Sequence, residues 1–330
     1  MCVSPRVLST ANLTSVGDFP LRSSNVRLFD CSIVQLFAMQ DATQKARVLI
    51  EALPYIQAFR GSWVVVKFGG SAMEDAATID SVLQDIIFME CVGMRPIIVH
   101  GGGKAISRGM EEHGMPARFV KGLRVTCEKT IAIVEKVIKG EVNPRIVDAI
   151  NALGGRAVTV HGEDVLHVEK KQEVDALTGE MLDWGFVGEP GEVDVTAIRA
   201  LVEQGTIPVI TPLGMGGDGK VHNVNADVAA AAVAQALAVR KLVFLSDVPG
   251  LLRDPEDPAS LLETLQTSEL EQLIEDGVIG GGMLPKCSSG VAALHAGVRK
   301  VHMVDGRVKH SLLLEIFTQQ GIGTEIVSTE

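Results

Sequence analysis

The 330-residue sequence lacks the cysteine pattern of a disulfide framework or a zinc site. Its five cysteines, at positions 2, 31, 91, 127 and 287, are odd in number and form no CxxC pair. Disulfides of secreted domains and cysteine ligands of structural zinc come in even or closely spaced sets. The sequence therefore predicts a protein of a reducing compartment, without disulfides and without zinc.

The sequence also lacks clustered basic residues, long apolar runs and a dinucleotide-binding fingerprint. Its 30 Lys and Arg stand against 41 Asp and Glu, for a net charge of −11. This argues against a general nucleic-acid binder, because phosphate binding needs grouped cations. No apolar run reaches the ~18 residues expected of a membrane span. No GxGxxG follows a predicted strand, so nicotinamide binding is not indicated, whereas small anionic ligands remain possible.

The sequence does contain many short apolar runs, and 46% of its residues are hydrophobic. This suffices for one large two-lobed core or two ordinary domains. The periodicity predicts strands at 63–68, 96–100, 157–160, 207–211, 241–247 and 300–305, and helices at about 76–92, 104–113, 128–152, 194–204, 226–238, 268–276, 284–296 and 310–319. Such repeated βα units predict a mostly parallel sheet covered on both faces. Residues 161–192 break the alternation and are predicted to form hairpins that cover one end as a lid.

The first forty residues have a different composition, rich in serine, with scattered arginines and few acidic residues. This composition is typical of an organellar transit peptide. The segment could equally be untranslated sequence upstream of a natural start at Met39. We expect residues 1–40 to be a disordered extension and the protein to be cytoplasmic, with a plastid location as the alternative.

Residues 41–60 predict an amphipathic helix that begins at an Asp41 cap and is kinked by Pro54. Such a helix ahead of the first strand has no obvious place in a doubly wound sheet. It could pack on a neighbouring subunit or fold back over its own domain.

Two glycine clusters follow predicted strands. In VVVKFGGSAM, Lys67 stands near the strand end and is followed by Gly69 and Gly70, and in VHGGGKAI, residues Gly101 to Gly103 join a strand to a helix. Open α/β sheets bind ligands beyond the carboxyl ends of their strands, and glycine N–H groups beside a helix N-terminus can bind an anion. The pattern predicts a phosphate or oxyanion cradle made by two loops. Taken alone, Lys67 would also fit an ordinary strand end with a lysine directed to solvent.

A third glycine-rich stretch, GMGGDGK at 214–220, has the spacing of a phosphate-binding P-loop. Val221 stands where that loop requires Ser or Thr, and no helix follows directly. We therefore predict a hairpin turn at this position.

Other polar residues complete the candidate site. Asn223, Asn225 and Asp227 alternate at strand spacing, which places them on one face ahead of an alanine-rich helix. Asp227 could simply cap that helix, although a cap needs only one such residue. Arg124, in GLRVT, is predicted to lie in a loop, where its guanidinium could bind a carboxylate through two hydrogen bonds. The motif GGGMLPK again combines glycines with a lysine, Lys286.

In this order, VKFGGSAM, VHGGGKAI, GLRVT, NVNAD, LSDVPG, GGGMLPK and GIGTEI resemble the motifs of N-acetylglutamate kinases in the amino acid kinase superfamily. The resemblance covers about residues 42 to 328, and Lys104 departs from it at a position where proline is frequent. It implies an open αβα sandwich with a substrate lobe at about 61–225 and a nucleotide lobe at about 226–330. It also implies ATP-dependent phosphorylation of the side-chain carboxylate of N-acetyl-L-glutamate, the second step of arginine biosynthesis.

The resemblance further implies roles for individual residues. Lys67 and Lys286, oriented by Asp227, would stabilise the negative charge of the phosphoryl group during transfer. The other implied residues are Gly70, Gly102 and Gly103 as N–H donors, Arg124 and Asn223 as ligands of the acetylated amino acid, and Asp247, Val248, Pro249, Gly250, Leu251, Leu252, Val278, Ile279 and Gly280 around the nucleotide. Mg²⁺ would arrive bound to ATP rather than at a dedicated protein site.

Regulation is also implied by the resemblance. Arginine-inhibited members of the family have a similar helix before the first strand and a similar C-terminal segment, here KHSLLLEIFTQQGIGTEI at 309–326. The resemblance therefore implies a hexamer, as a trimer of dimers, and feedback inhibition by L-arginine. The implied arginine ligands are Tyr55, Lys241, His310, Glu315 and Gly323. The alternative is that Glu315 lies on a solvated helix face and that Tyr55 serves packing alone.

Two other functions remain open from the sequence. A related kinase could phosphorylate an aminoadipate derivative or aspartate, and a longer substrate pocket would distinguish it. A non-catalytic arginine sensor could keep the fold, but a binding module has no need for Lys67, Lys286 and Asp227 together.

Overall fold

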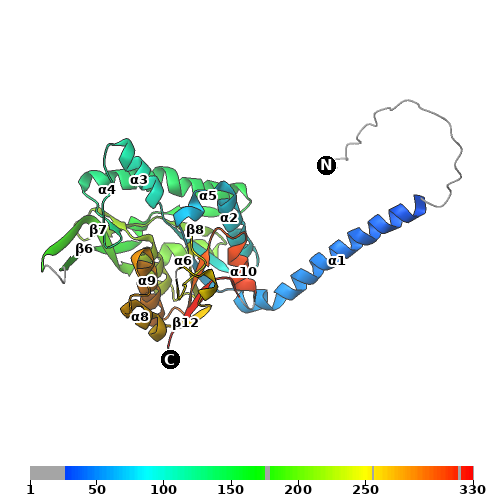
Figure 1. Cartoon of the computed structure of the whole chain (residues 1–330). Coiled ribbons are helices and arrows are strands. Elements are labelled where there is room, and N and C mark those ends of the chain that lie inside the picture. Colours follow the sequence, from blue (N-terminus) through cyan, green and yellow to red (C-terminus); the bar gives the residue numbers. More distant parts are fainter. Residues whose placement is uncertain (1–26, 175–178, 255, 319–320, 330) are drawn as a thin grey trace, which may run out of the picture. The chain divides into compact units, whose positions relative to one another are not determined.

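The computed structural model of the chain describes residues 27–174, 179–254, 256–318 and 321–329. The chain divides into two units, Met1–Leu53 and Pro54–Glu330. The described part of the first unit is helical and belongs to α1, which spans Arg27–Phe59 (Figure 1). The predicted start at Asp41 is wrong, because no glycine or proline interrupts the residues between Arg27 and Asp41. Residues 1–26 of the predicted extension lie outside the described residues.

The second unit is built on an eight-stranded sheet of order β12-β14-β13-β11-β1-β2-β8-β5. The strands are β1 Trp63–Phe68, β2 Arg95–His100, β5 Ala157–Val160, β8 Ile207–Ile210, β11 Lys241–Ser246, β12 Thr264–Gln266, β13 Lys300–Asp305 and β14 Thr324–Val327. Only β13 and β14 pair in antiparallel fashion within this sheet, so the prediction of a mostly parallel sheet is confirmed. The strands β12 and β14, which are 3 and 4 residues long, were not predicted from the sequence.

Both faces of this sheet are buried. Val64 and Val66 belong to one hydrophobic cluster, whereas Val65 between them belongs to another, since successive side chains of a strand point to opposite faces. The first cluster includes residues of α2 Ala76–Cys91, α3 Gly103–Glu112, α4 Glu128–Val137, α5 Asn143–Ala152 and α10 Ser311–Phe317. The second includes residues of α6 Thr196–Glu203, α7 Ala226–Ala236, α8 Thr267–Glu275 and α9 Leu284–His295. The predicted helix layers on both faces are therefore confirmed.

Residues 161–192 contain the expected hairpin. It consists of β6, Leu166–Val174, and β7, Met181–Val193, which run antiparallel side by side (Figure 1). These strands form a small closed barrel with β9, Leu213–Gly216, and β10, Val221–Val224. Because β9 and β10 are antiparallel neighbours, the predicted hairpin turn at 214–220 is also confirmed.

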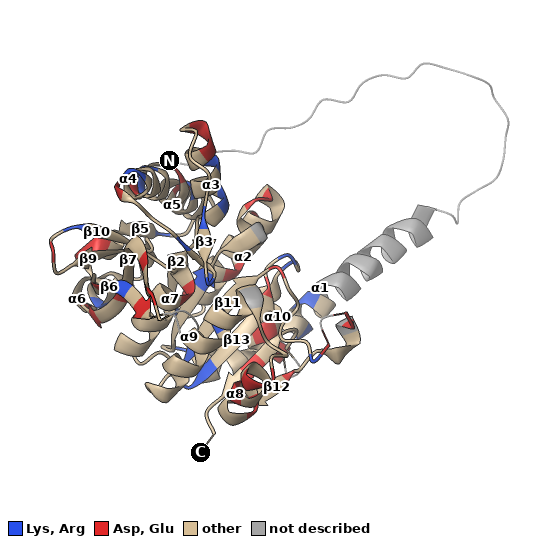
Figure 2. Cartoon of the chain, turned by 60° about the vertical axis from the view of Figure 1, so that its left-hand side comes forward, with Lys and Arg blue, Asp and Glu red and all other residues tan. Residues whose placement is uncertain are grey.

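The remaining short elements connect these layers. They are the strands β3 Phe119–Val120 and β4 Leu123–Arg124, the 3-10 turns Gly70–Met73, Gly162–Asp164, Pro258–Ser260 and Gly281–Met283, and a π-helical turn, Ile138–Val142, between α4 and α5. Acidic and basic residues are interspersed over the second unit (Figure 2). Among the described residues, no helix has both the length and the apolar character needed to cross a membrane.

Candidate active site

A cavity of about 730 Å³ is lined by the predicted catalytic and substrate-binding residues except Lys286. Those that line it are Lys67, Gly70, Gly102, Gly103, Arg124, Asn223 and Asp227. The strands β1 and β2 are adjacent and parallel, so the loops at their carboxyl ends lie together. A side chain on Gly101 would begin only 3.5 Å from the Cα atom of Gly69. The two glycine loops therefore run in direct contact, as a cradle made by two loops requires.

The charged centre of the site is one carboxylate between two ammonium groups. Lys67 Nζ lies 2.9 Å from Asp227 Oδ1, and Lys286 Nζ lies 3.6 Å from Asp227 Oδ2. Lys67 and Asp227 are 7% and 6% exposed. The contact at Oδ1 is an ion pair without the geometry of a hydrogen bond, since this oxygen accepts none within the described residues. The three groups together carry one surplus positive charge, which suits the binding of an anion.

Asp227 is available for this pairing because Asn225 caps the helix. Asn225 Oδ1 accepts the backbone N–H groups of Asp227, at 2.8 Å, and Val228, at 3.2 Å. The alternative that Asp227 serves as the cap is therefore wrong. The prediction that Asn223, Asn225 and Asp227 share one face of a strand is also wrong. The strand β10 ends at Val224, and Asp227 lies in the first turn of α7. Asn223, on β10, still lines the same cavity.

Arg124 lies on the strand β4 rather than in the predicted loop, because residues 119–120 and 123–124 pair as a short hairpin. Its guanidinium stacks over the ring of Phe119, with Cζ 4.7 Å from the ring centroid. Nη2 donates to Gly103 O and to Ser107 Oγ, both at 2.9 Å. Burial lowers the pKa of Arg124, because water is removed from the charged form. These contacts fix the guanidinium at the wall of the cavity.

The glycine loops offer backbone donors to a ligand. Gly70 has a φ of +70°, which a residue with a side chain rarely adopts. A Cβ atom on Gly102 would lie 2.5 Å from Ile138 Cδ1, so a side chain there would require Ile138 to move. Within the described residues, the N–H groups of Gly102 and Gly103 donate to no acceptor. The N-terminus of α3 thus presents two free donors at the cavity.

The predicted nucleotide segments, 247–252 and 278–280, are not among the residues that line this cavity. The side chains of Leu251 and Ile279 are 2% and 6% exposed and belong to the hydrophobic core. The Leu251 N–H donates to Thr324 Oγ1 at 2.8 Å. Because its side chain is buried, Leu251 could contact a nucleotide only through its backbone atoms in this structure.

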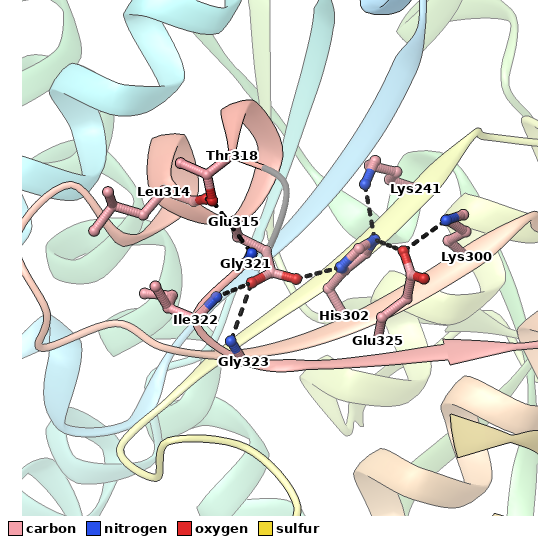
Figure 3. A network of polar contacts seen from close by, with 10 residues as sticks. All are labelled: Lys241, Lys300, His302, Leu314, Glu315, Thr318, Gly321, Ile322, Gly323 and Glu325. Carbon is pink, nitrogen blue, oxygen red and sulfur yellow. Dashed lines mark hydrogen bonds and ion pairs between the residues drawn. The ribbon is translucent and has the colours of Figure 1, made fainter. Parts of the chain in front are cut away.

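Three of the predicted arginine ligands meet around a histidine that the sequence reasoning missed (Figure 3). His302 Nδ1 lies 2.7 Å from Glu315 Oε1, and His302 Nε2 lies 2.9 Å from Lys241 Nζ. The other oxygen of Glu315 accepts the N–H groups of Ile322 and Gly323, at 2.8 and 3.1 Å. His302 interrupts the apolar run between Val301 and Val304 of β13, and this was the available signal in the sequence. The alternative of a solvated Glu315 is wrong, since that residue is 8% exposed.

The electrostatics of this network follow from burial and pairing. Burial lowers the pKa of Lys241 to about 8, and burial also lowers the pKa of His302. Burial raises the pKa of Glu315, but hydrogen bonds from His302 and from the Ile322 and Gly323 N–H groups outweigh this effect and leave the pKa lowered. A neutral His302 therefore bridges a cation and an anion.

The other two predicted arginine ligands do not join this network. His310 Nδ1 lies 2.7 Å from Asp85 Oδ1 on α2. Tyr55 lies on α1 and is partly exposed.

Comparison with known proteins identifies the family of this chain. The model of the amino acid kinase family matches residues 62–305. The acetylglutamate kinase of Heliobacterium modesticaldum is 45% identical over 294 residues, which cover 88% of this chain and 100% of the relative. That of Caldanaerobacter subterraneus subsp. tengcongensis is 48% identical over 286 residues, which cover 87% of this chain and 94% of the relative.

Solved structures agree with this result. The N-acetylglutamate synthase of Neisseria gonorrhoeae, complexed with coenzyme A and N-acetyl-glutamate, superposes with a TM-score of 0.74 at 29% identity. The match covers 86% of this chain but only 63% of the synthase. The carbamate kinase of Giardia lamblia bound to AMP-PNP has a TM-score of 0.61 at 17% identity and covers 82% of this chain and 99% of its own, which supports the fold alone. The chain thus belongs to the amino acid kinase family and, within it, to the acetylglutamate kinases.

Proposed function

We propose that this chain transfers the γ-phosphoryl group of ATP to the side-chain carboxylate of N-acetyl-L-glutamate. The observation that carries the proposal is the placement of Asp227 between Lys67 and Lys286, beside two glycine loops. A phosphoryl group in transfer spreads negative charge over its oxygens, so catalysis consists mainly of positioning and charge stabilisation. Two fixed ammonium groups and free backbone donors supply both.

The reaction requires no general base. A carboxylate oxygen of the substrate attacks the γ-phosphorus, a new P–O bond forms, and the bond to the β-phosphate oxygen breaks to release ADP. Lys67 and Lys286 would stabilise the charge on the transferring and leaving oxygens, and the Gly70, Gly102 and Gly103 N–H groups would bind the phosphoryl group and the attacking carboxylate.

Substrate recognition is assigned to Arg124 and Asn223, which line the same cavity. We propose that the fixed guanidinium of Arg124 binds the α-carboxylate of N-acetyl-L-glutamate. The side-chain amide of Asn223 would bind the acetamido end. Asn223 Nδ2 lies 3.4 Å from Thr126 Oγ1, which orients its amide along the cavity wall.

The cofactor is proposed to be ATP with Mg²⁺. The nucleotide would lie against residues 247–252 and 278–280. No group of three or more His, Cys, Asp or Glu side chains that could hold a metal lies within the described residues. We therefore propose that Mg²⁺ enters with the ATP phosphates, as is usual for this ion in kinases.

An ADP-release assay tests the activity, with N-acetyl-L-glutamate compared with glutamate, aspartate and N-acetylaminoadipate. Hydroxylamine in the same reaction traps an acyl phosphate as a hydroxamate, which separates phosphoryl transfer from ATP hydrolysis. A preference for N-acetylaminoadipate would instead favour the alternative, a related kinase that acts on an aminoadipate derivative.

We also propose that L-arginine, as the end product of the pathway, inhibits the enzyme at the network of Lys241, His302 and Glu315. Free arginine carries a guanidinium and a carboxylate, which complement the buried anion and cation of this network. Support comes from the Neisseria gonorrhoeae synthase, whose structure with coenzyme A and L-arginine has a TM-score of 0.70 at 29% identity, over 84% of this chain and 64% of the synthase. Inhibition requires that arginine bind one state of the enzyme more tightly than the other.

The arginine proposal is tested with two glutamate variants. Glu315→Gln should remove inhibition by L-arginine, whereas Glu271→Gln, at an exposed position of α8, should leave it intact. Equal inhibition of both variants would assign arginine to another site.

Finally, we propose that α1 assembles the chain into a hexamer, as a trimer of dimers, in the cytoplasm. Val48, Leu49 and Ile50 on this helix are 54%, 63% and 68% exposed, and adjacent apolar residues of this kind are typical of an interface. Light scattering of the full chain measures the mass of the assembly. Sequencing the N-terminus of the mature protein would distinguish the cytoplasmic from the plastid alternative.

A further inference from the structure

Beneath the second glycine loop lies a chain of three hydrogen-bonded polar side chains, two of them fully buried. His100 is the last residue of β2, Asn143 is the first residue of α5, and Thr159 lies on β5. His100 and Asn143 are both 0% exposed. None of the three residues is among those that line the cavity. Buried polar groups are retained only where their hydrogen bonds are made, so the contacts of this chain indicate its purpose.

The hydrogen bonds determine the orientation of the Asn143 amide. The carbonyl oxygen of Val209 can only accept, and it lies 3.1 Å from Asn143 Nδ2. Asn143 Oδ1 accepts from the hydroxyl of Thr159 on the other side. The amide nitrogen therefore also faces His100 Nε2, at 3.1 Å.

This orientation determines the proton position on the His100 ring. Because the Asn143 nitrogen can only donate, His100 Nε2 must be the unprotonated acceptor. Burial lowers the pKa of His100 to about 4, so the ring is neutral near pH 7. The single proton is then on Nδ1, which donates to the carbonyl oxygen of Gly101 at 2.7 Å.

The bond to Gly101 fixes the peptide that follows. In a planar trans peptide, the carbonyl of Gly101 and the N–H of Gly102 point in opposite directions. Holding the carbonyl against the buried ring of His100 turns the Gly102 N–H away from it. Gly102 lines the cavity, and its N–H has no acceptor within the described residues. Three consecutive glycines carry no side chain that could impose this orientation, and their backbone is otherwise free to rotate.

We propose that His100, Asn143 and Thr159 form a positioning chain that holds the Gly102 N–H in the direction of the reacting phosphoryl group. The inference rests on the proposed phosphoryl transfer at the glycine loops. The three residues touch no substrate, and they act through the Gly101–Gly102 peptide alone.

The first test is Asn143→Asp, which keeps the shape of the side chain but removes the donor. Because the new carboxylate can only accept, a neutral His100 ring would carry its single proton on Nε2 and donate it to the carboxylate, and it would lose the Nδ1–H that bonds to Gly101. The carboxylate also raises the pKa of His100, and below that pKa the doubly protonated ring can make both bonds. We expect kcat to fall about 10²-fold at pH 8, as for loss of one oxyanion donor, and to recover as the pH is lowered. The kcat of wild type should not rise in this way as the pH is lowered.

The second test does not depend on Asn143→Asp folding well. Thr159→Val removes only the hydroxyl that holds Asn143 Oδ1, at a partly exposed position, and Thr159→Ser keeps the hydroxyl as the matched control. We expect kcat to fall about 3- to 10-fold in Thr159→Val, as for loss of one neutral hydrogen bond. The KM for ATP should stay the same, and Thr159→Ser should resemble wild type.

Nitrogen-15 NMR of the histidine rings provides a readout without substrate. Wild type should show His100 as the Nδ1–H tautomer from pH 6 to 8, and Asn143→Asp should show a different protonation state. A wild-type enzyme that does not phosphorylate N-acetyl-L-glutamate would refute the proposed function and leave this tautomer measurement intact. An active wild type with equal kcat in Thr159→Val and Thr159→Ser, or with the Nε2–H tautomer, would overturn the positioning chain.

Discussion

Asp227→Asn is the most direct perturbation of the charged centre, because it removes one charge and preserves the size of the side chain. In wild type the carboxylate lies 2.9 Å from Lys67 Nζ and 3.6 Å from Lys286 Nζ. Lys67 is only 7% exposed, so water cannot readily replace the lost partner. The variant therefore leaves a buried ammonium without a counter-charge.

The magnitude follows from these distances. With an effective dielectric constant of about 20, the gross attraction is about 6 kcal/mol to Lys67 and about 5 kcal/mol to Lys286. Desolvation offsets most of this attraction, and removing one member of a buried pair costs about 3–5 kcal/mol. We expect the free energy of unfolding to fall by about 3 kcal/mol, which is the lower end of this range. The reason is that Lys286 is more exposed than Lys67, so water can partly solvate its ammonium group after the change. We expect kcat to fall at least ~10²-fold, because both lysines lose their orientation.

The assay is a double-mutant cycle with Lys67→Met, measured by urea denaturation. Lys67→Met removes the ammonium that Asp227→Asn leaves unpaired, so the double variant should lose less stability than the sum of the single variants. We expect a coupling of at least about 1 kcal/mol, as for residues in direct contact. Additive losses would show that the two charges do not pair in solution and would refute this reasoning.

Three further predictions concern the other parts of the molecule. Arg124→Lys should raise the KM for N-acetyl-L-glutamate about 10-fold or more with little change for ATP, because a lysine cannot reproduce two parallel hydrogen bonds; a loss of ATP binding in calorimetry would contradict the assignment. Burial lowers the pKa of Lys241 to about 8 from 10.5, so above pH 8 the unfolded chain binds a proton that the native chain does not. Stability in urea should therefore rise from pH 8 to 10 in wild type and not in Lys241→Met. Deleting residues 1–60 should leave an active dimer that L-arginine no longer inhibits, and full inhibition of that dimer would exclude the helix from regulation.

Much of the fold could be predicted because burial leaves a periodic pattern in the sequence. The strands β1 and β2 each contain an unbroken apolar run, Val64–Val66 and Pro96–Val99, since both faces of the sheet are covered by helices. The start of α1 at Arg27 was missed, because Asp41 was taken as the capping residue and the apolar residues of the helix form no single stripe. The strand β14 was missed because its pairing with β13 lies in the tertiary structure rather than in local sequence.

The candidate site was predictable to the extent that it depends on strand ends and glycines. Lys67 and the two glycine loops were found because parallel neighbours place their carboxyl ends together. The alternative that Asp227 caps the helix could be rejected only with the structure, since the sequence does not reveal that Asn225 takes the cap position. The strand position of Arg124 was equally hidden, because a hairpin of two residue pairs has no periodicity.

The buried polar residues show the deeper limit of reading a sequence. A glycine motif identifies where a ligand can approach the backbone, but glycines cannot orient their own peptide groups. The orientation of the Gly101–Gly102 peptide depends on His100, whose proton position depends on Asn143, 43 residues further along the chain. Asn143 is oriented in turn by the carbonyl of Val209, on another strand. The residues that make a glycine loop functional are therefore set by the packing of the sheet and the helix beneath it, and a motif that contains only the loop omits them.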